Sequence, residues 1–279
     1  MSGPEAPLSA GAPADATSER VHYGDIVVVG GGCYGSYYVQ QLRRAREAGA
    51  LDWERLLVVD RDAGCRVFAA ERDRPGPAPA AGVAPAALPI TPVARDWSLF
   101  FRDYLAAAAA RPREEIARDS IVPSPLMPHL MSHWVVARAR ERWPGRVLRL
   151  VPLDGAVDVP WQRAGDDGTH YVSFATWECP INCVEPRTCP HTRGPRAWSL
   201  PPTLRAFVET ERLRGRRIDG PAVFHCAHRA YGVGMFDVSA VVEADALVAS
   251  VAAGRAAEVL IGTVSHCHGA LTVLELSAP

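Results

Sequence analysis

The sequence predicts an α/β fold in which an N-terminal parallel sheet is followed by a second α/β region rich in cysteine and histidine. Two largely apolar runs at 25–29 and 55–60, the first of them rich in β-branched residues, enclose a helical stretch, which is the order expected of buried parallel strands. Further along the chain, three cysteines fall within eleven residues and two short Cys–His groups lie near the C-terminus. These groups distinguish the second region from the first.

Composition limits the classes of function. The chain has 279 residues, of which 48% are hydrophobic and 22% charged, so it can bury a sizeable core. Thirty basic residues against thirty-one acidic ones give a net charge of -1. Because no global field attracts phosphate or anionic lipid, we expect no nucleic acid partner and no membrane insertion.

The N-terminus predicts neither an export signal nor an anchor. Residues 1–19 are rich in Ala, Pro, Ser and Gly and lack a basic segment followed by an apolar one. No later run reaches the roughly 18 apolar residues that span a bilayer. We therefore expect a cytoplasmic protein with a disordered tail over 1–20, a first domain over 21–151 and a Cys/His-rich region over 152–279. Cytoplasmic thiols stay reduced, so no disulfide framework is expected.

The first elements follow one another closely. A strand over 25–29 leads into a glycine loop and a helix from about residue 36 to residue 47, and Gly49 ends that helix. The second strand, 55–60, ends on Asp60. Residues 66–70 predict a third short strand, whereas the Pro- and Ala-rich stretch 74–92 predicts a mobile loop.

The rest of the chain alternates between regular and irregular segments. Asp96 opens a helix, and the residues that complete the first domain predict a strand, a helix and a final strand. The stretch from about 152 to 221 is predicted to consist mainly of turns. The predicted elements are a helix from 97 through about 105, strands 120–123 and 146–151 with a helix 130–142 between them, strand 222–225, helix 239–253, and strands 259–264 and 271–276.

The glycine loop has the spacing of a phosphate-binding loop. A dinucleotide diphosphate needs glycines at the tight turn, at the point of closest approach and at the helix–strand contact. Gly30, Gly32 and Gly35 occupy these three places. We therefore predict a cofactor-binding segment formed by Gly30, Gly31, Gly32, Cys33, Tyr34 and Gly35, with Asp60 and Arg61 at the end of the next strand.

Residues 23–70 resemble the N-terminal domains of the NAD(P)-binding Rossmann oxidoreductase superfamily, and the region also looks like the dehydrogenase domain of sirohaem synthase or a potassium-channel regulatory domain. The resemblance implies a Rossmann-like parallel sheet. It also implies that Asp60 binds the adenine ribose hydroxyls, which favours NAD over NADP because a carboxylate repels a 2'-phosphate. Arg61 weakens that preference. FAD is the alternative ligand.

The cysteine-rich segment predicts a metal centre. Cys179, Cys183 and Cys189 are separated by three and five residues, and Pro follows two of them. Structural zinc sites usually have pairs of cysteines two residues apart, so this spacing favours an iron–sulfur cluster over zinc. Cys226 and Cys267 are the further thiolate candidates. Alternate ligands are His191, His225 and His228.

These observations lead to one main functional hypothesis and two others. The first is an NAD(P)-dependent oxidoreductase with a Cys-ligated metal centre near the nicotinamide, acting on a small-molecule substrate or a redox partner protein. The second is a nucleotide- and metal-sensing regulatory subunit without turnover, and the third is a sirohaem-type tetrapyrrole or metallocofactor biosynthesis dehydrogenase. Tyr231, His266 and His268 are the catalytic candidates. An oligomer is compatible with all three.

Overall fold

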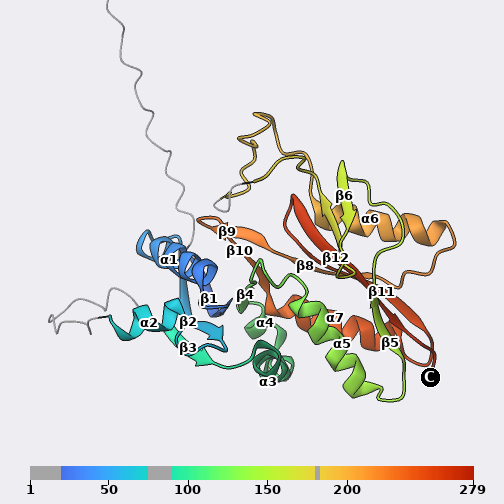
Figure 1. The fold of residues 1–279 in the computed structure, drawn as a ribbon, viewed down its shortest axis with the longest axis horizontal. Helices are drawn as coiled ribbons and strands as arrows, with labels where there is room; N and C mark the ends of the chain where they lie inside the picture. The colour runs from blue at the N-terminus through green and yellow to red at the C-terminus, as the bar shows by residue number, and fades with distance from the viewer. Residues whose placement is uncertain (1–19, 75–89, 180–182) are drawn as a thin grey trace, which may run out of the picture.

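The computed structural model describes residues 20–74, 90–179 and 183–279. It has a mixed α/β fold with two sheets, both of which contain parallel and antiparallel pairs. Figure 1 shows the first three strands of the chain at one end of the molecule and the last two at the other. None of the described helices is long and apolar enough to cross a membrane.

The first sheet has the strand order β3-β2-β1-β4-β10-β9. Its first four strands are mutually parallel, and β10 pairs with β4 in the antiparallel sense. Both of the last two strands come from the C-terminal half of the chain. The bounds are β1 (Val21–Val29), β2 (Leu51–Asp60), β3 (Ile90–Ala94), β4 (Ser120–Val122), β9 (Ala227–Ala230) and β10 (Val233–Asp237).

The second sheet has the order β6-β7-β12-β11-β8, and β5 pairs with β12 beyond the end of β7. Only β8 and β11 are parallel, since the other pairs in this sheet are antiparallel. The bounds are β5 (Leu148–Val151), β6 (Trp161–Ala164), β7 (His170–Ser173), β8 (Pro221–His225), β11 (Ala257–Val264) and β12 (His268–Leu276).

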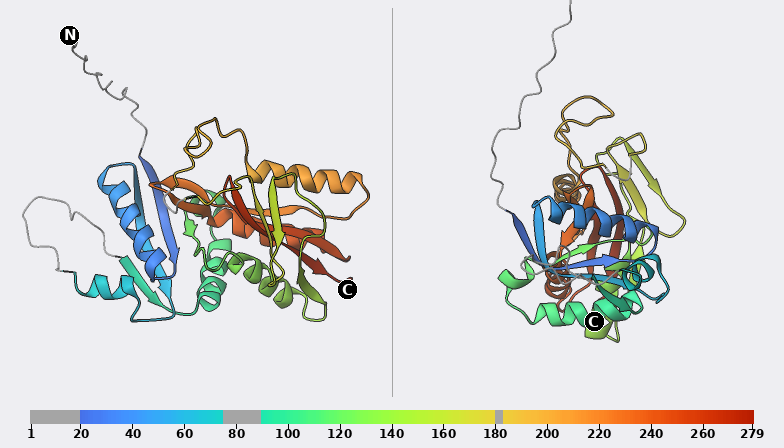
Figure 2. Two further views of the ribbon diagram at one scale, coloured as in Figure 1. Left: turned by 45° about the horizontal axis from the view of Figure 1, so that its top comes forward. Right: turned by 90° about the vertical axis from the view of Figure 1, so that its left-hand side faces the viewer.

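Helices cover both sheets (Figure 2). α1 and α2 pack on one face of the first sheet, α3, α5 and α7 lie in the layer shared by both sheets, and α6 covers the outer face of the second sheet. The bounds are α1 (Cys33–Glu47), α2 (Arg66–Arg72), α3 (Trp97–Ala109), α4 (Arg113–Ile116), α5 (Leu130–Arg142), α6 (Leu200–Leu213) and α7 (Val238–Val251).

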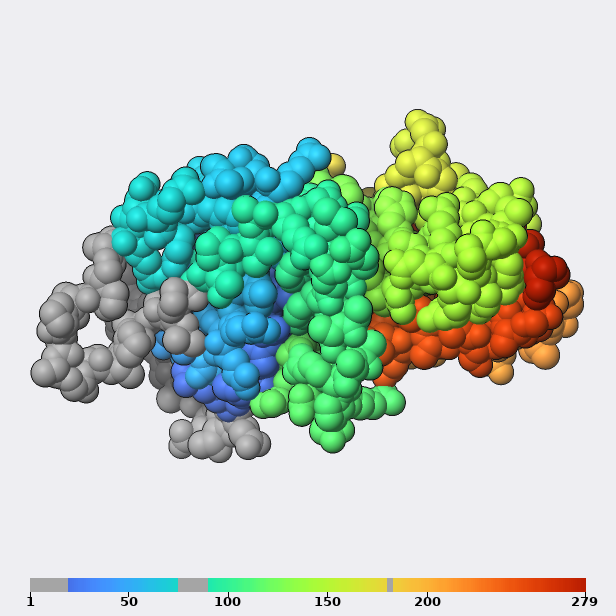
Figure 3. All heavy atoms as spheres, turned by 90° about the horizontal axis from the view of Figure 1, so that it is seen from below, coloured from blue at the N-terminus to red at the C-terminus, as the bar shows by residue number. Residues whose placement is uncertain are grey.

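The core explains why β1 is apolar throughout its second half. Val27 and Val29 point into the shared layer, whereas Ile26 and Val28 point toward α1 and α2. Successive strand residues face opposite sides, so a strand buried on both faces needs apolar residues at every position. The shared layer continues through Phe224 and Phe236 into the second sheet. Figure 3 shows the surface running without a break from the green residues to the yellow-green ones.

Most of the predicted elements are present. The strands predicted at 25–29, 55–60, 120–123, 222–225, 259–264 and 271–276 correspond to β1, β2, β4, β8, β11 and β12, and the helix predicted at 130–142 has the bounds of α5. Asp96 caps α3, since its carboxylate accepts the N–H groups of Ser98 and Leu99. Gly49 has the positive φ of a residue that ends a helix, 74°.

Two predictions about the first sheet are wrong. Residues 66–70 belong to helix α2 rather than to a strand, because Val67 and Phe68 bury one helical face and the neighbouring alanines favour helix. Ile90–Ala94 is strand β3, so the predicted loop over 74–92 does not extend that far; the middle of that loop lies outside the described residues. Pro92 is compatible with β3 because this strand is at the sheet edge.

The chain crosses between the sheets in both directions. The strand predicted at 146–151 is present as β5, yet it pairs with β12 in the second sheet instead of completing the first. Conversely, β9 and β10 join the first sheet. Each sheet therefore contains strands from both sides of residue 151. The stretch 152–221, which the sequence predicts to consist of turns, contains β6, β7 and the 14-residue helix α6. This helix has Pro in its first turn, where Pro is common.

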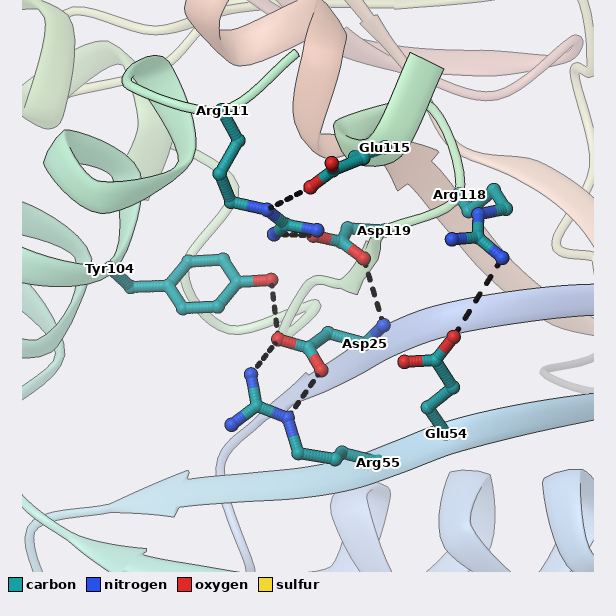
Figure 4. A network of polar contacts seen from close by, with 8 residues as sticks. All are labelled: Asp25, Glu54, Arg55, Tyr104, Arg111, Glu115, Arg118 and Asp119. Carbon is teal, nitrogen blue, oxygen red and sulfur yellow. Dashed lines mark hydrogen bonds and ion pairs between the residues drawn. The ribbon is translucent and has the colours of Figure 1, made fainter. Parts of the chain in front are cut away.

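A partly buried polar network links the middle of β1 and β2 to α3 and to the segment just before β4 (Figure 4). The carboxylate of Asp25 on β1 accepts two hydrogen bonds from Arg55 on β2, at 2.7 and 2.5 Å, and one from the Tyr104 hydroxyl on α3 at 3.2 Å. The carboxylate of Asp119 accepts the backbone N–H of Asp25 at 2.9 Å and an N–H of Arg111 at 2.6 Å. Because these contacts join β1, β2, α3 and the segment before β4, they fix how the strands align.

Replacing Asp119 by Ala should lower the free energy of unfolding by about 3 kcal/mol, because the N–H of Asp25 loses its acceptor in a buried place. The Asp119 side chain is only 1% exposed. Asp103→Ala is the control, since Asp103 is half exposed and its pairs with Arg95 and Arg102 are at the surface. Urea unfolding followed by circular dichroism measures both. Equal effects of the two substitutions would contradict this role of the network.

Candidate functional site

The glycine loop is a tight turn between β1 and α1. Gly30 has a φ of 89°, which favours glycine, and its N–H donates to the carbonyl of Val59 on β2 at 2.8 Å. A Cβ on Gly35 would lie 1.9 Å from the carbonyl oxygen of Gly30, so only glycine fits where α1 leaves the strand. A Cβ on Gly31 would collide with the sulfur of Cys65. The loop therefore requires glycine at these three positions for geometric reasons.

The loop presents backbone donors beside a carboxylate. The N–H of Gly31 donates to Asp60 at 2.7 Å, which places this carboxylate next to the loop. α1 begins at Cys33, three residues before the predicted start, and no described side chain caps it. Gly32, Cys33 and Tyr34 are exposed. The first turn of α1 thus offers N–H groups and the positive end of a helix to an anion.

A large cavity lies at the carboxyl end of β4, the strand next to β1. It has a volume of about 830 Å³, and Pro123 and Ser124, which follow β4 directly, form part of its wall. Val122 of β4 is paired with Val28 of β1, so the first residues after β4 lie level with the start of the glycine loop. In an open parallel sheet, ligands bind at this edge, outside the carboxyl ends of the strands.

Segments far apart in the sequence bring cysteines and histidines into this cavity. Its walls include four of the five predicted metal-ligand cysteines and two of the predicted histidines, namely Cys179, Cys183, Cys226, Cys267, His228 and His268. Cys226 is the residue between β8 of the second sheet and β9 of the first. All seven cysteines of the chain are free. The crossing between the sheets therefore positions part of the thiol-lined wall.

Burial favours the uncharged form of three thiols of this wall, and of the imidazoles of His268 in the wall and His225 behind it. Burial raises the pKa of Cys226 to about 12 and also raises the pKa values of Cys179 and Cys267. Burial lowers the pKa values of His225 and His268. Cys189 differs, since hydrogen bonds from the backbone around Thr192 lower the pKa of its thiol.

Glu185 is a buried carboxylate in the same wall that the sequence interpretation did not single out. Its side chain is 5% exposed, and its negative charge adds to the raised pKa values of Cys226 and Cys267. Its Oε1 accepts the backbone N–H of His266 at 3.1 Å. The only feature of the sequence that points to Glu185 as a site residue is its position two residues after Cys183, inside the cysteine-rich segment. A single Glu before Pro does not by itself indicate a site.

The other predicted site residues lie outside the cavity wall. Cys189 is in a turn closed by hydrogen bonds with Arg193 and Gly194, and the ring of His191 stacks on Trp177 with centroids 4.4 Å apart. Tyr231 is in the turn between β9 and β10, below the guanidinium of Arg44. The structure does not bring these residues into the cavity.

His225 and His266 lie behind the cavity wall. Their rings are 4.6 Å apart, and Nδ1 of His266 is hydrogen-bonded to the Ser199 hydroxyl at 2.7 Å. His266 lines a second, separate cavity, together with Arg196. By contrast, His268 is in the wall of the main cavity, where its Nδ1 is hydrogen-bonded to the Ser173 hydroxyl at 2.9 Å.

The described residues do not form a ligand set for the predicted metal centre. Within residues 20–74, 90–179 and 183–279, no three His, Cys, Asp or Glu side chains are grouped so that they could hold a metal ion. Cys179 and Cys183 flank residues 180–182, which lie outside the described part of the chain. The iron–sulfur cluster and the zinc ion therefore remain predictions.

The fold and the cavity define a mixed α/β protein in which a glycine loop follows β1 and a thiol-lined cavity lies at the end of the adjacent strand β4. A family model described as "Uncharacterized protein, C-terminal domain" (AF_1314_C) matches residues 131–277, more than half of the chain, and the protein belongs to this family. The matched region contains the second sheet and most of the cavity wall but not the glycine loop. No curated protein and no solved structure matches the chain.

The two kinds of thiol should differ in reactivity. At pH 7.5, iodoacetamide should alkylate Cys189 roughly ten times faster than Cys267 or more, because only the thiolate reacts and its fraction rises as the pKa falls. As pH rises, the rate at Cys189 should reach half its maximum at a lower pH than the rate at Cys267, because the pKa of Cys189 is lowered and that of Cys267 is raised.

Peptide mass spectrometry after timed labelling measures both rates. Cys33, which is exposed, is replaced by Ser in all samples so that it does not consume reagent. Equal rates at Cys189 and Cys267, or faster labelling of Cys267, would contradict the assigned environments.

Proposed function

We propose that the protein is a dinucleotide-dependent oxidoreductase, with NAD as the favoured cofactor, whose substrate occupies the thiol-lined cavity. The observation that carries the proposal is the position of this cavity after β4, level with the glycine loop after the adjacent strand β1. A dinucleotide is long enough to place its diphosphate at one strand end and its reactive ring at the next.

The first sheet supports a Rossmann-like assignment. Strands β3, β2, β1 and β4 are parallel and in the order 3-2-1-4 of a dinucleotide-binding sheet. The glycine loop and the uncapped start of α1 would bind the diphosphate, and Asp60 would accept hydrogen bonds from the adenine ribose hydroxyls. FAD uses the same kind of loop and is the second cofactor to test.

A bound NAD would supply a hydride acceptor or donor. The residues of the chain would bind and orient the reactants and keep water out. Burial keeps the thiols of Cys226 and Cys267 protonated near pH 7, so these two side chains add no charge close to a nicotinamide ring. α1 packs against β9, the strand that follows Cys226, and burial raises the pKa of Tyr38 on this helix to about 12. α1 therefore connects the diphosphate loop to the cavity.

Asp60→Asn should weaken NAD binding roughly tenfold or more, because the ribose loses hydrogen bonds to a charged acceptor. The same substitution should weaken NADP binding less, since Asn does not repel a 2'-phosphate. Isothermal titration calorimetry with NAD, NADP and FAD measures these affinities in wild type and variant.

Asp73→Asn is the matched control, because it removes one exposed carboxylate just after α2 and should leave all three affinities unchanged. The proposal fails if the wild-type protein binds none of the three dinucleotides. It also fails if Asp60→Asn and Asp73→Asn bind NAD as tightly as wild type. Binding without turnover of any carbonyl, alcohol or amine substrate would favour the regulatory alternative.

A further inference from the structure

The hydrogen bonds around Ser173 determine which nitrogen of His268 carries a proton. The Ser173 hydroxyl lies 2.7 Å from the carbonyl oxygen of Ala175, and two oxygens come this close only with a hydrogen between them. Ser173 therefore donates its single hydroxyl hydrogen to Ala175. Its Oγ must then accept from its other two partners, the N–H of Ala175 and Nδ1 of His268, both at 2.9 Å. The proton of the neutral imidazole is thus on Nδ1.

The other nitrogen of this ring, Nε2, is an accessible acceptor. Burial lowers the pKa of His268 and so favours its neutral form, in which Nε2 carries no proton. Nε2 makes no hydrogen bond with a described residue, yet it is not buried. Among the described residues, the only histidine nitrogen that is buried without a partner is Nε2 of His225. Because His268 is part of the wall of the main cavity, its Nε2 can accept a hydrogen bond from a ligand there.

His228, the other histidine of this wall, has the same tautomer but different surroundings. Its Nδ1 lies 2.5 Å from the carbonyl oxygen of Cys183, which can only accept, so this Nδ1 also carries the proton. Its Nε2 lies beside Gly234 of β10, since a Cβ on that glycine would be 3.3 Å from it. Because the backbone of β10 occupies one side of this nitrogen, we assign the ligand contact to His268.

The rest of the wall suits an uncharged, flat molecule. Aromatic side chains supply flat apolar surface, namely those of Trp161, Tyr171 and Trp177. Neither Lys nor Arg is among the described lining residues, so an anion has no cation to pair with there. Of the two lining carboxylates, Glu185 already faces Arg196 at 3.8 Å, and Glu178 is exposed to solvent. A neutral ligand avoids the cost of moving a charge out of water.

We propose that the cavity binds a neutral aromatic alcohol, whose hydroxyl donates a hydrogen bond to Nε2 of His268 and whose ring lies against the aromatic side chains of the wall. That the alcohol is a substrate rests on the proposed function. On oxidation it would give a hydride from its carbon to NAD, which is thereby reduced, and its hydroxyl proton to Nε2 of His268, and it would leave as an aldehyde. Binding of the alcohol requires no dinucleotide.

Two pairs of probes test this inference: benzyl alcohol with benzyl methyl ether, and 2-naphthylmethanol with its methyl ether. An ether accepts a hydrogen bond but cannot donate one. Titration calorimetry of the wild-type protein should therefore show each alcohol binding roughly fivefold more tightly than its ether or better, because the ether leaves Nε2 of His268 without a donor. His268→Phe keeps a planar ring but removes this acceptor, and it should abolish the preference for alcohol over ether.

His22→Phe is the matched control, because His22 is a half-exposed residue of β1 outside the cavity wall, and this variant should keep the wild-type preference. Similar affinities for alcohol and ether in both pairs, or no binding of either alcohol, would overturn the proposal. Retention of the full preference in His268→Phe would also overturn it. The wild-type comparison needs no variant, so it decides the question even if His268→Phe fails to fold.

The tautomer of His268 is tested without any ligand. Long-range proton–nitrogen NMR spectra of isotope-labelled protein at pH 7.5 distinguish the two ring nitrogens, and the signals that disappear in His268→Phe belong to this residue. They should show a protonated Nδ1 and an unprotonated Nε2. A proton on Nε2 in the wild-type protein would contradict the proposal, because that nitrogen could not accept from the hydroxyl.

Asp60→Asn separates this inference from the proposed function. Alcohol binding measured without dinucleotide should be the same in Asp60→Asn and in wild type, because Asp60 lies at the glycine loop and outside the cavity wall. If the alcohols bind in preference to the ethers but no dinucleotide binds, the alcohol site stands and the oxidoreductase proposal fails. If dinucleotide binds but the alcohols do not, the reverse holds.

Discussion

The pairing of β10 with β4 is the contact on which the rest of the site depends. It is short, with Phe236 opposite Ile121 and Asp237 opposite Ser120, and the N–H of Val238 adds a hydrogen bond to the carbonyl of Asp119. Through it, the C-terminal half of the chain is attached to the parallel strands that carry the glycine loop. Without this pairing, the chain after β8 would have no reason to leave the second sheet.

This pairing also explains why the cavity has walls from so many segments. The chain leaves β8 at His225, turns at Cys226 and enters the first sheet as β9 and β10. The hydrophobic layer made by α3, α5 and α7 is continuous beneath both sheets, so the two sheets form one body around the carboxyl end of β4. The family match covers β9 and β10 but begins after β4, the strand that β10 pairs with in the N-terminal part of the chain. The cavity is therefore assembled by both parts of the chain.

The sequence was informative where local pattern determines structure. The glycine spacing, the apolar strands around it and Asp60 predicted the loop, because these features are properties of adjacent residues. The position of β5 in the second sheet and the return of β10 to the first depend on contacts more than 100 residues apart, as between Ser120 and Asp237. No periodicity in the sequence encodes such pairings. The sequence predicts the cysteines as one set of ligands. In the structure Cys189 lies outside the cavity wall, whereas Glu185 lies in it. Both positions depend on how the irregular segment folds, which local sequence pattern does not determine.

The most direct test of the account is a crystal structure of the protein with bound NAD. The account predicts the diphosphate against the backbone of Gly30–Gly35, the adenine ribose at Asp60, and the nicotinamide ring in the cavity after β4, facing the wall that contains Cys267. A diphosphate bound elsewhere, or a nicotinamide directed away from this cavity, would contradict the claim that the glycine loop and the thiol-lined cavity form one site.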